Sequence, residues 1–158
     1  MIEVSTVVNG VERVLTLEGN ELLLDVLRET LHLTGTKRSC DVEVCGACTV
    51  LLDGAAVSAC TTLAAEMHDR AVTTIEGLAD GDELHPMQRA FVEHGASQCG
   101  YCTPGMIMSA CALLNDHPGA DEPAVRDYLA GTICRCTGYA KIVEAVTDVL
   151  RTESGERG

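Results

Sequence analysis

The arrangement of its cysteines constrains this chain more than any other feature of the sequence. Nine cysteines occur among 158 residues, and eight of them form two groups of four: Cys40, Cys45, Cys48 and Cys60, then Cys99, Cys102, Cys134 and Cys136. The count is odd, and the first residues, MIEVSTVVNG, show neither a basic start nor an apolar signal segment. Both features fit a disulfide framework poorly, because such frameworks belong to oxidising compartments. We therefore expect metal-binding cysteines in a cytoplasmic protein.

The first group has the spacing C-x4-C-x2-C with a fourth cysteine downstream. This is the plant-type spacing for a [2Fe–2S] cluster, in which four thiolates converge on two irons. Gly46 lets the backbone approach such a cluster, and neighbouring N–H groups can donate hydrogen bonds to the sulfurs. Zinc is the alternative, but zinc knuckles usually come as paired C-x2-C units. The spacing favours an iron–sulfur cluster.

The second group consists of two close pairs, C-x2-C and C-x-C. On ligand chemistry alone it could hold either zinc or a cluster. Both pairs end in Cys-Thr, and both precede a predicted helix, which makes a faint internal repeat. Helix N-termini favour the negative charge of thiolate ligands.

The hydrophobic pattern divides the chain between strands and helices. Strands are predicted over 2–8 and 11–17, joined by an Asn-Gly turn, and over 48–52, 55–61 and 71–75, with a helix over about 21–31. Cys60 would arrive on the second strand after the Asp53-Gly54 turn. Helices are predicted over 86–95 and from Thr103-Pro104, Glu122-Pro123 and Thr137-Gly138, where Thr103 would act as a cap.

These elements predict an α+β protein with two small domains. The first is a β-grasp, ferredoxin-like [2Fe–2S] domain over residues 1–76, followed by a linker over 77–86. The second is an all-α four-helix bundle over 87–151 that holds the other cysteine group, with a flexible tail over 152–158. Each half is small enough to need a metal centre as a staple.

Composition and motifs exclude several classes of function. With 24 acidic and 11 basic residues, the net charge of −13 argues against nucleic acid as a partner. No apolar run approaches the roughly 18 residues of a membrane span. The sequence contains no nucleophile–base pair or phosphate loop, so we assign no catalytic residue to this chain.

Four segments together resemble a known family: 36–54 (TKRSCDVEVCGACTVLLDG), 85–91 (HPMQRAF), 98–106 (QCGYCTPGM) and 134–139 (CRCTGY). They are similar to the iron–sulfur subunit of the molybdenum hydroxylases, which include xanthine dehydrogenase, aldehyde oxidoreductase and aerobic carbon monoxide dehydrogenase. The resemblance covers roughly residues 1–150. One departure is visible: residues 41–44 lack the glycines that many relatives carry, and Ser39 stands where glycine is frequent.

The resemblance implies two [2Fe–2S] clusters, one for each group of four cysteines. It implies that Gln98 and Cys136 contact a molybdopterin, in its cytosine dinucleotide form, that carries molybdenum on a large partner subunit. A medium subunit would bind FAD, in a dimer of heterotrimers. Electrons would run from molybdenum through the helical cluster and the β-grasp cluster to FAD. The alternative is a freestanding two-cluster electron carrier.

Three further features have plainer interpretations. Cys111 lies on the apolar stripe of its helix and is expected to be a small buried residue. The five histidines are expected at the surface or at helix ends, with His85-Pro86 shaping a helix start. Arg135, between two predicted ligands, would tune the potential, grip the cofactor or form an ordinary ion pair.

Overall fold

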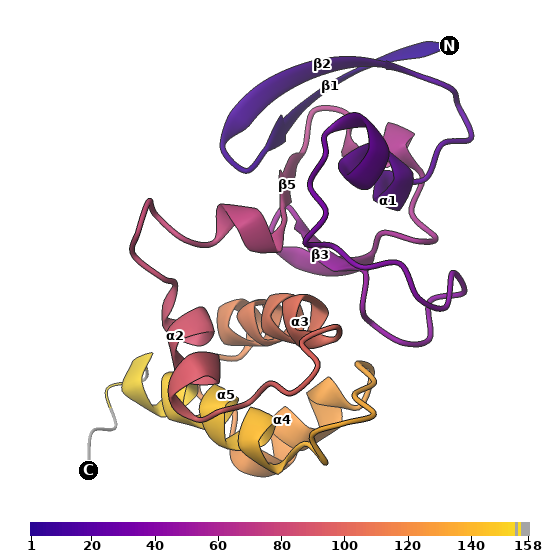
Figure 1. Cartoon of the computed structure of the whole chain (residues 1–158). Coiled ribbons are helices and arrows are strands. Elements are labelled where there is room, and N and C mark those ends of the chain that lie inside the picture. The colour runs from indigo at the N-terminus through magenta and orange to yellow at the C-terminus, as the bar shows by residue number, and fades with distance from the viewer. Residues whose placement is uncertain (154, 156–158) are drawn as a thin grey trace.

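The computed structural model describes residues 1–153 and 155 of the chain. Two groups of buried residues form two hydrophobic cores, one beneath a β-sheet and one among helices (Figure 1). The sheet and the cysteine loop lie in the N-terminal half, and the helices lie in the C-terminal half. Figure 1 shows α3 at the boundary, next to β3.

The sheet has five strands in the order β2-β1-β5-β3-β4. Their bounds are Ile2–Val8 (β1), Val11–Leu17 (β2), Thr49–Leu52 (β3), Ala55–Ser58 (β4) and Ala71–Thr73 (β5). All neighbours pair antiparallel except β1 and β5, which are parallel. The β1–β2 hairpin turns at Asn9 and Gly10, whose φ angles of 50° and 78° suit a two-residue turn.

A short helix packs on the sheet, as the β-grasp prediction requires. It begins as α1 (Leu23–Asp25) and widens into the π-helical turn η1 (Val26–Thr30). Its apolar residues join Val4, Val50 and Val72 of the strands in one core. The two 3-10 turns of this half are η2 (Ala64–Met67) and η3 (Ile75–Gly77).

Three predicted strands are shorter than expected, and β3 begins at Thr49 rather than at Cys48. β5 ends at Thr73 rather than at residue 75, and β4 ends at Ser58 rather than at residue 61. After Ser58 the chain turns back on itself, because the N–H groups of Thr61 and Thr62 both donate to the Ser58 carbonyl oxygen. The prediction that Cys60 lies on a strand was therefore wrong, since it lies in this turn.

Four helices form the second half: α2 (Pro86–Glu93), α3 (Thr103–Asp116), α4 (Glu122–Leu129) and α5 (Ala140–Glu153). Helix α3 is buried continuously from Gly105 to Leu113. It contacts α2 and α4 and also the strands β3 and β4, so little of its surface is left to solvent. None of the helices within residues 1–153 is long and apolar enough to cross a membrane.

The helix starts follow the predicted signals in two cases. His85 Nδ1 accepts a hydrogen bond from the Met87 N–H at the start of α2, and Asp121 accepts one from the Ala124 N–H at the start of α4. At α3 the cap is Cys102 rather than Thr103, whose hydroxyl instead donates to Ser97.

The last helix differs from its prediction at both ends. It begins at Ala140, not at Thr137-Gly138, because Gly138 and Tyr139 both have a φ of 67°, which no α-helix permits. It continues to Glu153, two residues into the predicted tail. Residues 154 and 156–158 of that tail lie outside the described residues.

Candidate metal centres

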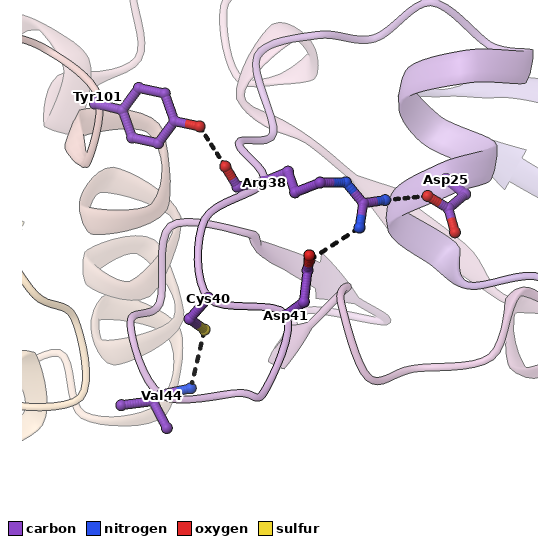
Figure 2. Close-up of polar contacts among 6 residues, drawn as sticks. All are labelled: Asp25, Arg38, Cys40, Asp41, Val44 and Tyr101. Atoms are coloured by element: carbon purple, nitrogen blue, oxygen red, sulfur yellow. Dashed lines mark hydrogen bonds and ion pairs between the residues drawn. The ribbon is translucent and has the colours of Figure 1, made fainter.

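The first site is built on the loop that follows α1 and η1. The Val44 N–H donates to the Cys40 sulfur at 3.4 Å (Figure 2). The N–H groups of Val42 and Cys45 donate to the same sulfur. These hydrogen bonds, that of Val42 first, lower the pKa of the Cys40 thiol to about 6, so this sulfur is held as a thiolate near neutral pH.

The strands β3 and β4 close the first site. Cys48 immediately precedes β3 and Cys60 follows β4, so the antiparallel pairing of these strands brings the two cysteines together. Both are buried, at 3% exposure. Burial first, and then the neighbouring Cys60 and Cys45 thiols, raise the pKa of the Cys48 thiol to about 12. Cys48 therefore pairs with Cys60, as Cys40 pairs with Cys45.

The second site is built on the starts of two helices. Cys102 caps α3, and the segment from Cys134 to Tyr139 leads into α5. The Thr137 hydroxyl donates to the Cys134 sulfur at 3.0 Å, and the Thr137 N–H donates to it at 3.4 Å. Burial alone would raise the pKa of Cys134, but these hydrogen bonds outweigh it and the pKa is lowered.

The cysteines of the second site also lie in pairs. Cys102 interacts with Cys134, and burial together with that neighbour raises the pKa of Cys102 to about 12. Cys99 and Cys136 are exposed, and their mutual hydrogen bond raises the pKa of Cys136. All four cysteines line one cavity of about 220 Å³, into which Cys45 of the first site also faces.

This pairing fits a binuclear cluster. The described residues contain no group of three or more His, Cys, Asp or Glu side chains placed to hold a single metal ion. In each site thiols lie close enough to interact, Cys48 with Cys60 in the first and Cys102 with Cys134 in the second, and a [2Fe–2S] cluster takes two thiolates on each of its two irons. The donor sets therefore fit the predicted cluster.

The two sites meet where the halves of the molecule touch. The Ile133 N–H donates to the Cys45 carbonyl oxygen at 2.9 Å, which joins the segment before Cys134 to the first loop. Gly105, in the first turn of α3, packs on the same loop. A Cβ at Gly105 would overlap the Gly46 carbonyl oxygen and lie 3.0 Å from the Ala47 Cα. Only glycine at this position of α3 allows the two backbones to come this close.

Gly46 has a further role besides the one that its sequence context predicted. A Cβ at Gly46 would lie 2.9 Å from the Gly131 carbonyl oxygen, in the helical half. The glycine thus makes room for the neighbouring half, and its φ of 69° also favours glycine, whereas its approach to a metal centre stays a prediction.

A second link between the halves was not predicted. The Tyr101 hydroxyl, between Cys99 and Cys102, donates to the Arg38 carbonyl oxygen (Figure 2). The Arg38 guanidinium in turn donates to Asp41 in the cysteine loop and to Asp25 in α1. Tyr101 and Arg38 are 63 residues apart in sequence, and no local pattern marks such a contact.

The remaining predicted residues lie as follows. Cys111 is 4% exposed in the core of the helical half, and its sulfur lies 3.9 Å from His85 Nδ1 and outside both groups of four. The prediction that it is a small buried residue is confirmed. Gln98, Arg135 and Cys136 are exposed at the second site. Contact of Gln98 and Cys136 with a pterin stays a prediction.

Comparisons with known proteins agree with this site. Residues 6–79 match the 2Fe-2S iron-sulfur cluster binding domain, and residues 74–147 match a [2Fe-2S] binding domain. The nicotine 6-hydroxylase small subunit of Paenarthrobacter nicotinovorans is 49% identical, over 93% of this chain and 88% of that protein. The aldehyde oxidoreductase iron-sulfur-binding subunit of Escherichia coli K12 is 44% identical, over 89% of this chain and 68% of that protein.

Solved structures give the same result for the fold. Quinoline 2-oxidoreductase from Pseudomonas putida 86 matches 99% of this chain and 97% of its own chain, with a TM-score of 0.92 and 42% identity. The aldehyde oxidoreductase from Desulfovibrio gigas matches 99% of this chain with a TM-score of 0.94 and 44% identity. This chain covers only 18% of that longer polypeptide.

Proposed function

This chain belongs to the iron–sulfur subunits of the molybdenum hydroxylases, and from this premise we propose that it conducts electrons between two partner subunits of such an enzyme. The observation that carries the proposal is that the two groups of four cysteines meet where the halves of the molecule touch, with Cys45 of the first group lining the same cavity as all four cysteines of the second. A carrier with one exposed cluster would need only the first half.

We propose that each site binds one [2Fe–2S] cluster through its four sulfurs. The ligands are Cys40, Cys45, Cys48 and Cys60 in the β-grasp half, and Cys99, Cys102, Cys134 and Cys136 in the helical half. When bound, each cluster supplies reversible one-electron exchange.

The protein's own residues prepare the sulfurs for this task. N–H donors of the loop stabilise Cys40 as a thiolate, and Thr137 does the same for Cys134. Burial keeps water from Cys48, Cys60 and Cys134. Hydrogen bonds to the sulfurs raise a cluster's reduction potential, and exposure also influences it, so the two loops adjust the potentials as well as the geometry.

We infer the two ends of the electron path from the residues that are exposed at each site. Cys99, Cys136 and Gln98 lie at the surface of the helical half, and we propose that they face a molybdopterin, in the cytosine dinucleotide form, on a large subunit. The exposed loop between Cys40 and Cys45 would face FAD on a medium subunit. The complete enzyme would be a dimer of heterotrimers in the cytoplasm.

The test is the metal and flavin content of the tagged chain purified with its partners from its native host. We expect about four irons per chain, as two binuclear clusters require, together with molybdenum and FAD. Iron without molybdenum or flavin would favour a freestanding carrier instead. Zinc in place of iron would contradict both functions.

A further inference from the structure

The loop between Cys40 and Cys45 adopts a conformation that its own residues disfavour. Asp41 and Glu43 have φ angles of 56° and 58°, in the left-handed region. Aspartate tolerates this region because its short side chain can bond locally, whereas glutamate has no such advantage. The segment from Cys40 to Cys45 contains no glycine. The surrounding structure must therefore hold the loop in place.

The conformation places backbone donors on one sulfur. The left-handed residues alternate with Val42 and Val44, and the Val44 N–H donates to the Cys40 sulfur at 3.4 Å (Figure 2). Turns of this kind direct successive N–H groups into a concavity that suits an anionic atom. The left-handed backbone is therefore what allows the loop to surround the sulfur.

Each left-handed residue uses its carboxylate as a tether. The Asp41 carboxylate accepts a hydrogen bond from Arg38 at 2.9 Å, and Arg38 also donates to Asp25 of α1. The Glu43 carboxylate accepts one from the Thr61 hydroxyl at 3.0 Å, and Thr61 directly follows Cys60. Glycine would relieve the backbone but could form neither tether.

Apolar packing does not hold this loop. Val42 is 64% exposed and Val44 is 60% exposed, so the side chains between the two tethers face solvent. The tethers also differ in charge, because Asp41 faces a guanidinium whereas Glu43 faces a neutral hydroxyl. Negative charge near a cluster lowers its reduction potential, while N–H donors to its sulfurs raise it.

We propose that Asp41 and Glu43 are positioning residues of the first metal centre. Their tethers hold the left-handed loop around the Cys40 sulfur, and the charge of Glu43 lowers the reduction potential of the cluster bound there. This inference rests on the proposed function, since it requires a cluster on Cys40.

The test uses two variants that separate the tether from the charge. Glu43→Gln keeps an acceptor for Thr61 but removes the charge, so the potential of the first cluster should rise. Thr61→Val keeps the charge but removes the donor. The loop should then loosen and its N–H donors move away from the sulfur, so that the same potential should fall. The measurement is an anaerobic redox titration of the iron-loaded complex, in which electron paramagnetic resonance follows the two clusters separately.

Two control variants match these changes elsewhere. Asp69→Asn also removes one carboxylate charge from a left-handed residue, with a φ of 57°, at a side chain paired with His68. Thr62→Val removes a hydroxyl that donates to the Ser58 carbonyl oxygen, as Thr61 does, but has no bond to Glu43. Neither control should shift the first potential, and none of the four variants should shift the second.

The outcomes separate this inference from the proposed function. If Glu43→Gln and Thr61→Val both bind two clusters with wild-type reduction potentials, the inference is wrong but the proposed function stands. If Glu43→Gln fails to bind the first cluster, the test rests on Thr61→Val. A lower potential of the first cluster in Thr61→Val supports the inference, and an equal or higher potential contradicts it. If both variants lose the first cluster while both controls keep it, the contact between Glu43 and Thr61 holds the loop as proposed. A wild-type chain without two [2Fe–2S] signals would overturn the proposed function itself.

Discussion

Each of the two cysteine sites contains four thiol groups, but different kinds of backbone structure hold the thiols in the two sites. The first depends on an irregular, exposed loop with two left-handed residues and charged tethers. The second depends on the starts of α3 and α5, and α3 is itself buried along most of its length. The comparison teaches that the thiol arrangement, rather than the type of backbone, is what the two halves share.

The sites also share a division of labour between their sulfurs. In each site one sulfur receives several hydrogen bonds, which lower its pKa, and another has its pKa raised mainly by full or partial burial. Cys40 and Cys134 are the first kind, and Cys48 and Cys102 are the second. Because thiolates bind metal, the buried sulfurs must release protons when metal binds.

The largest expected effect comes from replacing one cysteine of either site, which should remove the cluster of that site alone. Cys45→Ser and Cys102→Ser should each lose about two irons per chain, since each removes one binuclear cluster. Each should keep the other cluster, because the buried residues form two distinct core clusters, although Leu51 of β3 joins the helical one. Iron analysis and electron paramagnetic resonance measure the losses. In the complete enzyme, Cys45→Ser should also uncouple substrate oxidation from flavin reduction.

Cys111→Ala is the matched control for these losses. It removes a buried cysteine that lies in the helical core, and its iron content should equal that of the wild type. Loss of iron in Cys111→Ala would overturn the ligand assignment. Unchanged flavin reduction in Cys45→Ser would contradict the electron path.

The contact between the two halves is the next feature to test. In Gly105→Ala the new methyl group would meet the backbone of Gly46 and Ala47, which cannot rotate away. We expect a loss of about 1–3 kcal/mol in the free energy of unfolding, measured with urea, as for other overpacked sites. Magnetic coupling between the two reduced clusters should weaken if the halves move apart.

Gly119→Ala provides the comparison. A Cβ at Gly119 would meet nothing within 4 Å. This variant should keep wild-type stability and coupling. Equal losses in the two variants would show that the halves do not pack as tightly at Gly105 as described.

The two halves should differ in their response to pH. Burial lowers the pKa of His85 below its ordinary value of 6.5, so the unfolded chain takes up protons first as the pH falls, and α2 is destabilised below that value. Hydrogen bonds from Arg70 and Ala71 lower the pKa of Asp53 below 3.8, so this contribution to β5 is lost only in stronger acid. Amide hydrogen exchange of α2 and β5 between pH 7 and 5, divided by the intrinsic exchange rate at each pH, measures the difference, and we expect the protection to fall in α2 alone.

His85→Asn isolates the cause of this difference. Asparagine can still accept the Met87 N–H at the helix start, but it does not titrate. The pH dependence of α2 exchange should therefore become shallower. If the pH dependence of α2 exchange in His85→Asn equals that of the wild type, a group other than His85 causes it.

The smallest expected effect concerns the second link between the halves. Tyr101→Phe removes one hydrogen bond, from the ring hydroxyl to the Arg38 carbonyl oxygen, and should cost about 1 kcal/mol in the free energy of unfolding. Both clusters should still bind. Tyr128→Phe, in α4, is the control for loss of a tyrosine hydroxyl from the helical half, and it should leave exchange in the first cysteine loop unchanged. Tyr101→Phe should speed that exchange, and equal behaviour of the two variants would contradict the link.

Local patterns predicted most of the fold and both groups of cysteines. The hairpin was predicted to the residue, because its alternation and its Asn-Gly turn act over short distances. The position of Cys60, the start of α5 and the contact of Tyr101 with Arg38 were not predicted. The first two depend on local backbone conformations that no sequence pattern marked, namely the turn at Ser58 and the positive φ of Gly138 and Tyr139. The contact of Tyr101 with Arg38 forms only after the two halves have packed.

The glycines and the left-handed residues also show that local sequence patterns do not predict contacts between the two halves or unusual backbone conformations. Gly46 and Gly105 were recognisable in their motifs, but their contact with each other required both halves to be in place. Asp41 and Glu43 differ from glycine, and no rule of local sequence predicts a left-handed glutamate. The missing glycines at 41–44 marked this loop as unusual, but the left-handed conformation itself is seen only in the structure.

The most direct test of the account is electron paramagnetic resonance of the reduced, iron-loaded chain, with Cys45→Ser and Cys102→Ser as references. The account predicts two distinct [2Fe–2S] signals of equal intensity, of which one disappears in each variant. A single signal in the wild type, or the loss of both signals in either variant, would contradict the claim that this chain builds two separate cluster sites.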